Sequence, residues 1–139
     1  MDKRDEKIIE LLMDNSRISF TTIAEELGIS ETAVRKRMKK LEESGIIKAY
    51  TLLVDPFLIG YDGVALVGID TTPNKLLEVF EKIKHIKEVR YAALSSGDHM
   101  IVFEVWCKTK KELKSLLKDI ERIDGITRVC PAILLKHVT

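Results

Sequence analysis

The stretch Ser19–Tyr50, SFTTIAEELGISETAVRKRMKKLEESGIIKAY, has the pattern of two short helices joined by a glycine. Apolar residues recur every three or four positions across 20–27, which predicts a first helix with one buried stripe. Ser19 can cap that helix, and Gly28 can end it. Ser30 can cap a second helix that continues to Gly45. This pattern is typical of a helix-turn-helix, whose second helix lies in the major groove of DNA.

The second predicted helix carries a dense group of basic residues, and their positions suggest what they contact. Val34, Met38 and Leu41 recur at helical spacing and face inward. The opposite side then carries Arg35, Lys36 and Lys39, with Arg37 and Lys40 on the flanks. Charge runs are most often solvated helix faces, but here one sign of charge is confined to the second helix. We therefore predict that DNA is contacted by Ser30, Thr32, Arg35, Lys36, Arg37, Lys39 and Lys40.

Composition limits the other possibilities. The chain has 139 residues and a net charge of +1, so DNA binding has to come from local placement of charge. We expect a cytoplasmic protein with no membrane partner, because no apolar run has the roughly 20 residues of a membrane helix and the N-terminus lacks a signal-peptide pattern. Cys107 and Cys130 are interpreted as buried small side chains. They match no metal spacing, and His85, His99 and His137 are scattered, so we predict no metal, no cofactor and no catalytic residues.

The chain divides into two predicted domains. A further amphipathic helix over 2–15 precedes the pair, and the alternating run 46–54 is interpreted as a strand or wing. Residues 1–54 therefore form a winged-helix-like helix-turn-helix domain. Asp55-Pro56 and two nearby glycines mark a linker over 55–63, and residues 64–139 form the second domain.

The second domain has a βαββαβ pattern. Strands are expected at 64–69, 89–94, 100–107 and 126–135. One helix opens at Thr72-Pro73, and a capping box at Thr109–Glu112 opens the other. This order is typical of a ferredoxin-like fold, so the fold class is α+β.

The sheet of this domain is expected to be apolar on both faces. In the third strand Ile101, Phe103 and Val105 point one way, while Met100, Val102 and Trp106 point the other. Helices cover one face only, so a second copy of the chain is the expected cover for the other. Pro131 lies in the last strand, which indicates a sheet edge. In such a homodimer two basic helices can reach successive major grooves about 34 Å apart, on a roughly palindromic site.

Many of these residues together resemble a known family. The resemblance is carried by Asp2-x-x-Asp5-x-x-Ile8, Ile23-Ala24, Leu27-Gly28-x-Ser30, Val34-x-x-Arg37, Leu41-Glu42-x-x-Gly45-x-Ile47, Tyr50, Asp55-Pro56, Gly60 and Ser96-Gly97-Asp98. The chain is similar to the Lrp/AsnC transcriptional regulators, of the short archaeal type, over nearly its whole length. The resemblance implies a sequence-specific DNA-binding regulator that forms dimers, tetramers or octamers.

The resemblance also implies a C-terminal domain that binds an amino acid through a glycine–acid loop. In this chain the expected effector-binding residues of that loop are Ser96, Gly97, Asp98 and His99. An aspartate can hold an α-amino group, and N–H groups near a glycine can hold a carboxylate. The alternative is that Gly97-Asp98 serves only the turn. His99-Met100 departs from the aromatic or acidic residues that follow the aspartate in many relatives.

Two other functions compete with regulation. Related haem-pathway decarboxylases that act on a modified tetrapyrrole share the two-domain plan, and an amino-acid sensor without DNA binding is also conceivable. Neither has a reason to keep the basic second helix, so we predict a protein that is not an enzyme. Repression by promoter occlusion is the expected mode, with dual action as its alternative.

Overall fold

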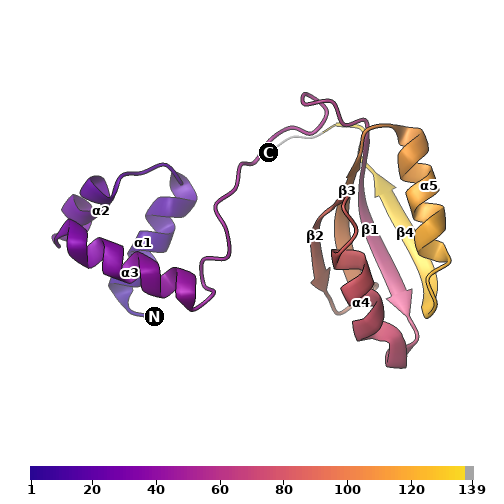
Figure 1. The fold of residues 1–139 in the computed structure, drawn as a ribbon, viewed down its shortest axis with the longest axis horizontal. Helices are drawn as coiled ribbons and strands as arrows, with labels where there is room; N and C mark the ends of the chain where they lie inside the picture. The colour runs from indigo at the N-terminus through magenta and orange to yellow at the C-terminus, as the bar shows by residue number, and fades with distance from the viewer. Residues whose placement is uncertain (137–139) are drawn as a thin grey trace. The chain divides into compact units, whose positions relative to one another are not determined.

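The computed structural model describes residues 1–136, which fall into a unit at Met1–Leu53 and a second unit that begins at Val54 (Figure 1). The first unit contains three helices: α1 (Lys3–Asp14), α2 (Phe20–Leu27) and α3 (Glu31–Glu43). The second contains β1 (Gly63–Thr71), the 3₁₀ turn η1 (Pro73–Lys75), α4 (Leu76–Lys84), β2 (Val89–Leu94), β3 (Ile101–Cys107), α5 (Lys110–Glu121) and β4 (Ile126–Ile133).

The three helices of the first unit are held by their caps and by one apolar cluster. The Ser19 hydroxyl accepts the Thr22 N–H, and the Ser30 hydroxyl accepts the Ala33 N–H, as their positions predict. Gly28, at φ 64°, ends α2 in the left-handed region. The cluster consists of Ile8, Ile23, Ala24, Val34, Met38 and Leu41. Because α3 buries Val34, Met38 and Leu41, its opposite side is left to solvent.

The predicted strand or wing over 46–54 is wrong for this structure, which shows no strand in that segment. The Ile47 N–H is bonded to the Leu41 carbonyl, which closes α3, and the segment then continues without a partner strand among the described residues. An alternating sequence forms a β-strand only where a neighbour pairs with its backbone groups. Ile46, Leu52 and Leu53 are consequently exposed.

The second unit is a four-stranded antiparallel sheet with the predicted ferredoxin-like βαββαβ order. Its strands lie in the order β2-β3-β1-β4, with α4 and α5 on one face (Figure 1). The segment predicted as a linker holds a turn over 56–60, in which the Tyr61 N–H is bonded to the Pro56 carbonyl. β1 then begins at Gly63.

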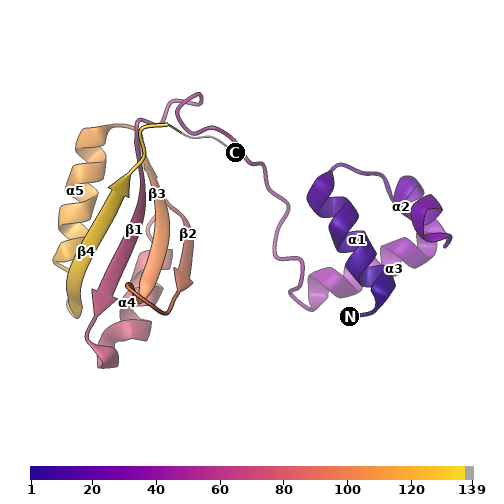
Figure 2. The same ribbon diagram turned by 180° about the vertical axis from the view of Figure 1, so that it is seen from behind.

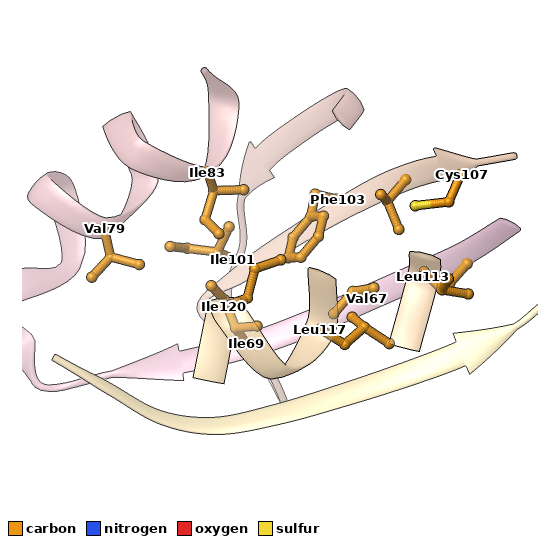
Figure 3. Close-up of a cluster of buried hydrophobic side chains, with 12 residues drawn as sticks. Val67, Ile69, Val79, Ile83, Ile101, Phe103, Cys107, Leu113, Leu117 and Ile120 are labelled. Carbon is orange, nitrogen blue, oxygen red and sulfur yellow. The ribbon is translucent and has the colours of Figure 1, made fainter. Parts of the chain in front are cut away.

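The core of this unit lies between the sheet and its two helices. Figure 3 shows side chains of α4 and α5 facing those of β1 and β3, with Phe103 among them. The residues that β3 contributes are Ile101, Phe103, Val105 and Cys107, which is the alternation predicted for that strand. Cys107 is buried, and burial raises the pKa of its thiol to about 11. Cys130 is only half-buried, so its predicted burial is partly wrong.

The other face of the sheet has no helix over it among the described residues (Figure 2). It carries Leu66, Tyr91, Val102 and Ala132, which line a shallow groove of about 400 Å³. Leu66 is 50% exposed, although it lies in a central strand. An apolar side chain at the middle of a sheet and half in solvent indicates a surface that lacks its cover.

β4 forms one edge of the sheet, as Pro131 predicts. The Leu134 N–H is bonded to the Val64 carbonyl, so even-numbered residues at this end of β4 turn their backbone groups toward β1. The odd-numbered Pro131 therefore turns its nitrogen to the free edge, where no hydrogen bond is lost.

Candidate functional site

The outward side of α3 is the first candidate site. Thr32, Arg35, Lys36 and Lys39 are all exposed. Arg35 and Lys36 each lie three or four residues from both Thr32 and Lys39, so the four share one side of the helix. Lys40 is also exposed, at the border of that side. Three to four cations on one helix turn a positive surface toward any polyanion that approaches.

Arg35 and Lys39 each make one contact with another side chain of this unit. The Arg35 guanidinium lies 5.1 Å from the centroid of the Phe20 ring, a cation–π contact that connects α3 to α2. Lys39 Nζ lies 3.7 Å from a Glu43 carboxylate oxygen, a pair in which both side chains are largely exposed. Such a pair contributes little and is easily exchanged. Both cations therefore remain free to bind phosphate.

Ser30 and Thr32 stand at the leading end of α3. The Ser30 oxygen is used as the helix cap, and its own O–H can still donate to a phosphate oxygen. Thr32 lies in the first turn, where exposed backbone N–H groups and the helix dipole favour an anion. Neighbouring Glu31 accepts the Thr21 O–H at 2.6 Å, so its carboxylate is held toward α2.

Arg37 is placed differently from the other predicted contacts, and its expected role in DNA contact is not supported by its position. Its guanidinium nitrogen lies 2.7 Å from an Asp2 oxygen and 2.8 Å from an Asp5 oxygen. The Asp5 side chain is only 6% exposed, and the Arg37 side chain only 24%. The hydrogen bond from Arg37 lowers the pKa of Asp2 to about 2, and the same bonds raise the pKa of Arg37. Arg37 thus fastens α3 to the start of α1.

The second candidate site is the loop between β2 and β3. The Ser95 N–H bonds to the Met100 carbonyl, and the Ser95 hydroxyl donates to the His99 carbonyl at 2.6 Å. Gly97 sits at φ 110°, in the region that favours glycine. Ser96 and Gly97 are exposed, and the Asp98 side chain is 79% exposed. The loop is therefore an ordered hairpin turn that presents a carboxylate to solvent.

Asp98 and His99 belong to a closed ring of four charged or titratable side chains. Asp98 Oδ2 lies 3.2 Å from an Arg128 nitrogen and 3.3 Å from His99 Nε2. Asp70 Oδ2 lies 3.5 Å from His99 Nδ1 and 3.6 Å from Arg128 Nε. We call Asp70, Asp98, His99 and Arg128 the charge ring. It connects the loop to β1 through Asp70 and to β4 through Arg128.

Contacts beneath the ring fix its inner members. A methyl group added at Gly68 would overlap the His99 imidazole, so the ring of His99 lies directly on β1. Asp70 Oδ1 accepts the Met100 N–H at 3.2 Å. Arg128 Nε donates to the Cys130 sulfur at 3.0 Å, and this contact, together with the nearby carboxylates, raises the pKa of Arg128.

Sequence reasoning missed Asp70 and Arg128. The register pairs these two residues directly across β1 and β4. The first strand was predicted to end at Ile69, one residue before Asp70, whereas β1 continues to Thr71. The register of the strands was not predicted, and only the register shows that the two side chains are neighbours. The available signal was an acidic residue on β1, Asp70, and a basic residue on the neighbouring edge strand β4, Arg128.

Residues 1–136 contain no group of three or more histidine, cysteine, aspartate or glutamate side chains placed so that it could hold a metal ion. His137 lies outside the described residues, and His85 Nδ1 lies 2.6 Å from the Glu81 carbonyl. Within the same range no helix is both long and apolar enough to cross a membrane.

Comparison with known proteins gives similarity over the entire chain. Residues 1–48 match the family description "Winged helix-turn-helix DNA-binding", and residues 64–139 match "Lrp/AsnC ligand binding domain". Proteins named HTH-type transcriptional regulator LrpA from Pyrococcus horikoshii and Pyrococcus abyssi are each 50% identical over 139 residues, covering 99% of both chains. The solved structure of E. coli AsnC is 28% identical with a TM-score of 0.77, covering 99% of this chain and 93% of that one.

Proposed function

The chain belongs to the Lrp/AsnC family of transcriptional regulators, with a helix-turn-helix DNA-binding domain followed by the family's ligand-binding domain, and from this premise we propose how it binds. Two copies dimerise through the open sheet face, and each inserts α3 into a major groove of operator DNA in the cytoplasm. The DNA-bound form is the dimer, or a tetramer or octamer built from it. It represses transcription by occluding the promoter. An amino acid held at the loop between β2 and β3 modulates binding.

The observation that carries the DNA part is the outward side of α3. It holds Thr32, Arg35, Lys36 and Lys39 in solvent, while the other side is buried in the three-helix cluster. Lys40 adds a fifth group at the border, and the Ser30 cap adds a hydroxyl at the leading end. Phosphate contacts of this kind release counterions, so affinity should fall steeply with salt.

The dimer rests on the uncovered sheet face. Leu66, Tyr91 and Val102 meet there, and no helix of residues 1–136 covers them; apolar faces of this kind are covered in stable assemblies. Leu66→Asp should convert the protein to monomers in sedimentation experiments. The control is Leu77→Asp on α4, which introduces the same charge at a leucine that is already 68% exposed. A dimer that survives Leu66→Asp contradicts this interface.

The DNA proposal is tested on fragments selected from genomic DNA by the purified protein, first with and then without a pool of amino acids. Lys36→Glu combined with Lys39→Glu should abolish band shifts on the selected fragment. Lys114→Glu combined with Lys118→Glu changes the net charge by the same amount on α5 of the other unit, and should retain most of the affinity. Equal affinity of the α3 variant and the wild type would refute the assignment of α3.

A further inference from the structure

We propose that Arg128, on the edge strand β4, receives the carboxylate of the amino-acid ligand while Asp98 receives its ammonium group, so that the charge ring opens to take up a zwitterion. This inference rests on the proposed amino-acid binding at the loop. It assigns the carboxylate to a side chain outside the loop, because residues 95–100 include no arginine or lysine.

The charges of the ring match those of an α-amino acid. An α-amino acid carries its two opposite charges on neighbouring atoms, and the ring places an exposed cation and an exposed anion next to each other. The Arg128 nitrogen and Asp98 Oδ2 are 3.2 Å apart. When the ligand enters between them, one ion pair within the protein is replaced by two between protein and ligand, and no charge is left without a partner.

The ion pair between Arg128 and Asp98 can be exchanged for ion pairs with a ligand. Asp98 is 79% exposed and Arg128 is 50% exposed. Ion pairs in solvent contribute little to stability, so their separation is readily offset by two new charge-assisted hydrogen bonds. A ligand also reaches both groups without a rearrangement of the core.

The inner half of the ring, which is Asp70 and His99, keeps Arg128 in place after Asp98 is released. Arg128 uses different nitrogens for its two aspartates: Nε lies 3.6 Å from Asp70, and a terminal nitrogen faces Asp98. Asp70 is itself fixed by the Met100 N–H. The planar guanidinium fork can therefore turn its terminal donors to a carboxylate while Nε stays beside Asp70.

His99 is a positioning residue in this account. Its imidazole is clamped over Gly68, with Nε2 3.3 Å from Asp98. Its buried Nδ1 lies 3.5 Å from Asp70 Oδ2 but makes no hydrogen bond with any described residue. The imidazole therefore holds Asp98 at one height above the sheet, where the ammonium group of a ligand would meet it.

The test uses calorimetric titration of the full-length protein with each of the twenty common L-amino acids. The tightest ligand is then compared with its amide, which lacks the carboxylate charge, and with its des-amino analogue, which lacks the ammonium. Wild type should bind the acid roughly tenfold or more tightly than the amide, as expected for a charge-assisted hydrogen bond. Arg128→Gln should bind both equally weakly, and Asp98→Asn should no longer distinguish the acid from its des-amino analogue.

The matched control is Arg122→Gln. Arg122 is an exposed arginine at the end of α5, whose recorded ion pair is a long contact of 3.9 Å with Asp119, and its removal should leave the preference for the acid unchanged. If Arg128→Gln still prefers the acid as wild type does, the carboxylate lies elsewhere and this inference falls, while the proposed amino-acid binding stands. If wild type binds none of the twenty, both fall.

Discussion

Each of the two units contains an arginine placed between two aspartates, and the two clusters differ mainly in burial. In the first unit Arg37 joins Asp2 and Asp5, with one carboxylate almost fully buried. In the second unit Arg128 joins Asp70 and Asp98, and its partner Asp98 is largely in solvent. Removing a partner from a buried pair leaves a charge without compensation, whereas an exposed pair exchanges with water at little cost. The same combination of one arginine and two aspartates therefore fastens helices in one unit and, in our proposal, takes up a ligand in the other.

The largest expected effect is a difference in thermal stability between variants of Arg37 and of Arg128. Arg37→Gln leaves the buried Asp5 carboxylate without its cation and should lower the melting temperature of the helical unit by on the order of 10 °C. Arg128→Gln, the matched variant in the exposed cluster, should lower melting by less than about 2 °C. Circular dichroism follows the helices of both units, and fluorescence of Trp106, the one tryptophan of the chain, follows the second unit alone, so the two signals together separate the units. Equal shifts in melting temperature for the two variants would contradict the expected difference between the buried and the exposed cluster.

The next effect depends on pH. Arg37 lowers the pKa of Asp2 from 3.8 to about 2 in the folded chain, so the ionised form is favoured by folding. A lowered carboxyl pKa contributes stability that is present above about pH 4 and is lost as the pH falls through about 2. The difference in melting temperature between wild type and Arg37→Gln should therefore shrink over that window. A difference that stays constant from pH 5 to pH 2 contradicts the account.

A smaller effect tests the close contact under the charge ring. Gly68→Ala places a methyl group where the His99 imidazole lies, and the side chain has to move outward. Because His99 lies near the surface, the cost should be about 1 kcal/mol in the free energy of unfolding. Denaturant titration should show this cost in the wild-type background and not in His99→Ala, where the space is free. A cost that persists in the double variant places the strain elsewhere.

Local sequence signals predicted most of the fold. The residues Ser19, Ser30 and Thr109 cap the helices that their positions indicated, and the alternation in β3 gave the correct buried face. Such signals act over a few residues, so they can be read without knowledge of the tertiary structure. The strand expected at 46–54 failed because pairing depends on a neighbour that the sequence does not identify.

The candidate sites were less predictable for the same reason. Helical periodicity placed Arg37 on a flank of α3, but its partner Asp5 is 32 residues earlier in the chain. Asp70 and Arg128 become neighbours only through the register of β1 and β4. Exposed Lys36 and Lys39 were predicted correctly as outward, since that depends on the helix alone.

The most direct test of the central claim is the salt dependence of DNA binding, because each phosphate contact adds to the slope of log K against log salt. Lys39→Gln should reduce the slope by about one per subunit. Arg37→Gln, measured at a temperature where it is folded, should leave the slope at the wild-type value even if affinity falls, because the Arg37 guanidinium is bonded to Asp2 and Asp5. If Arg37→Gln reduces the slope as much as Lys39→Gln does, then Arg37 contacts phosphate, and its role in holding α3 against α1 is not its main one.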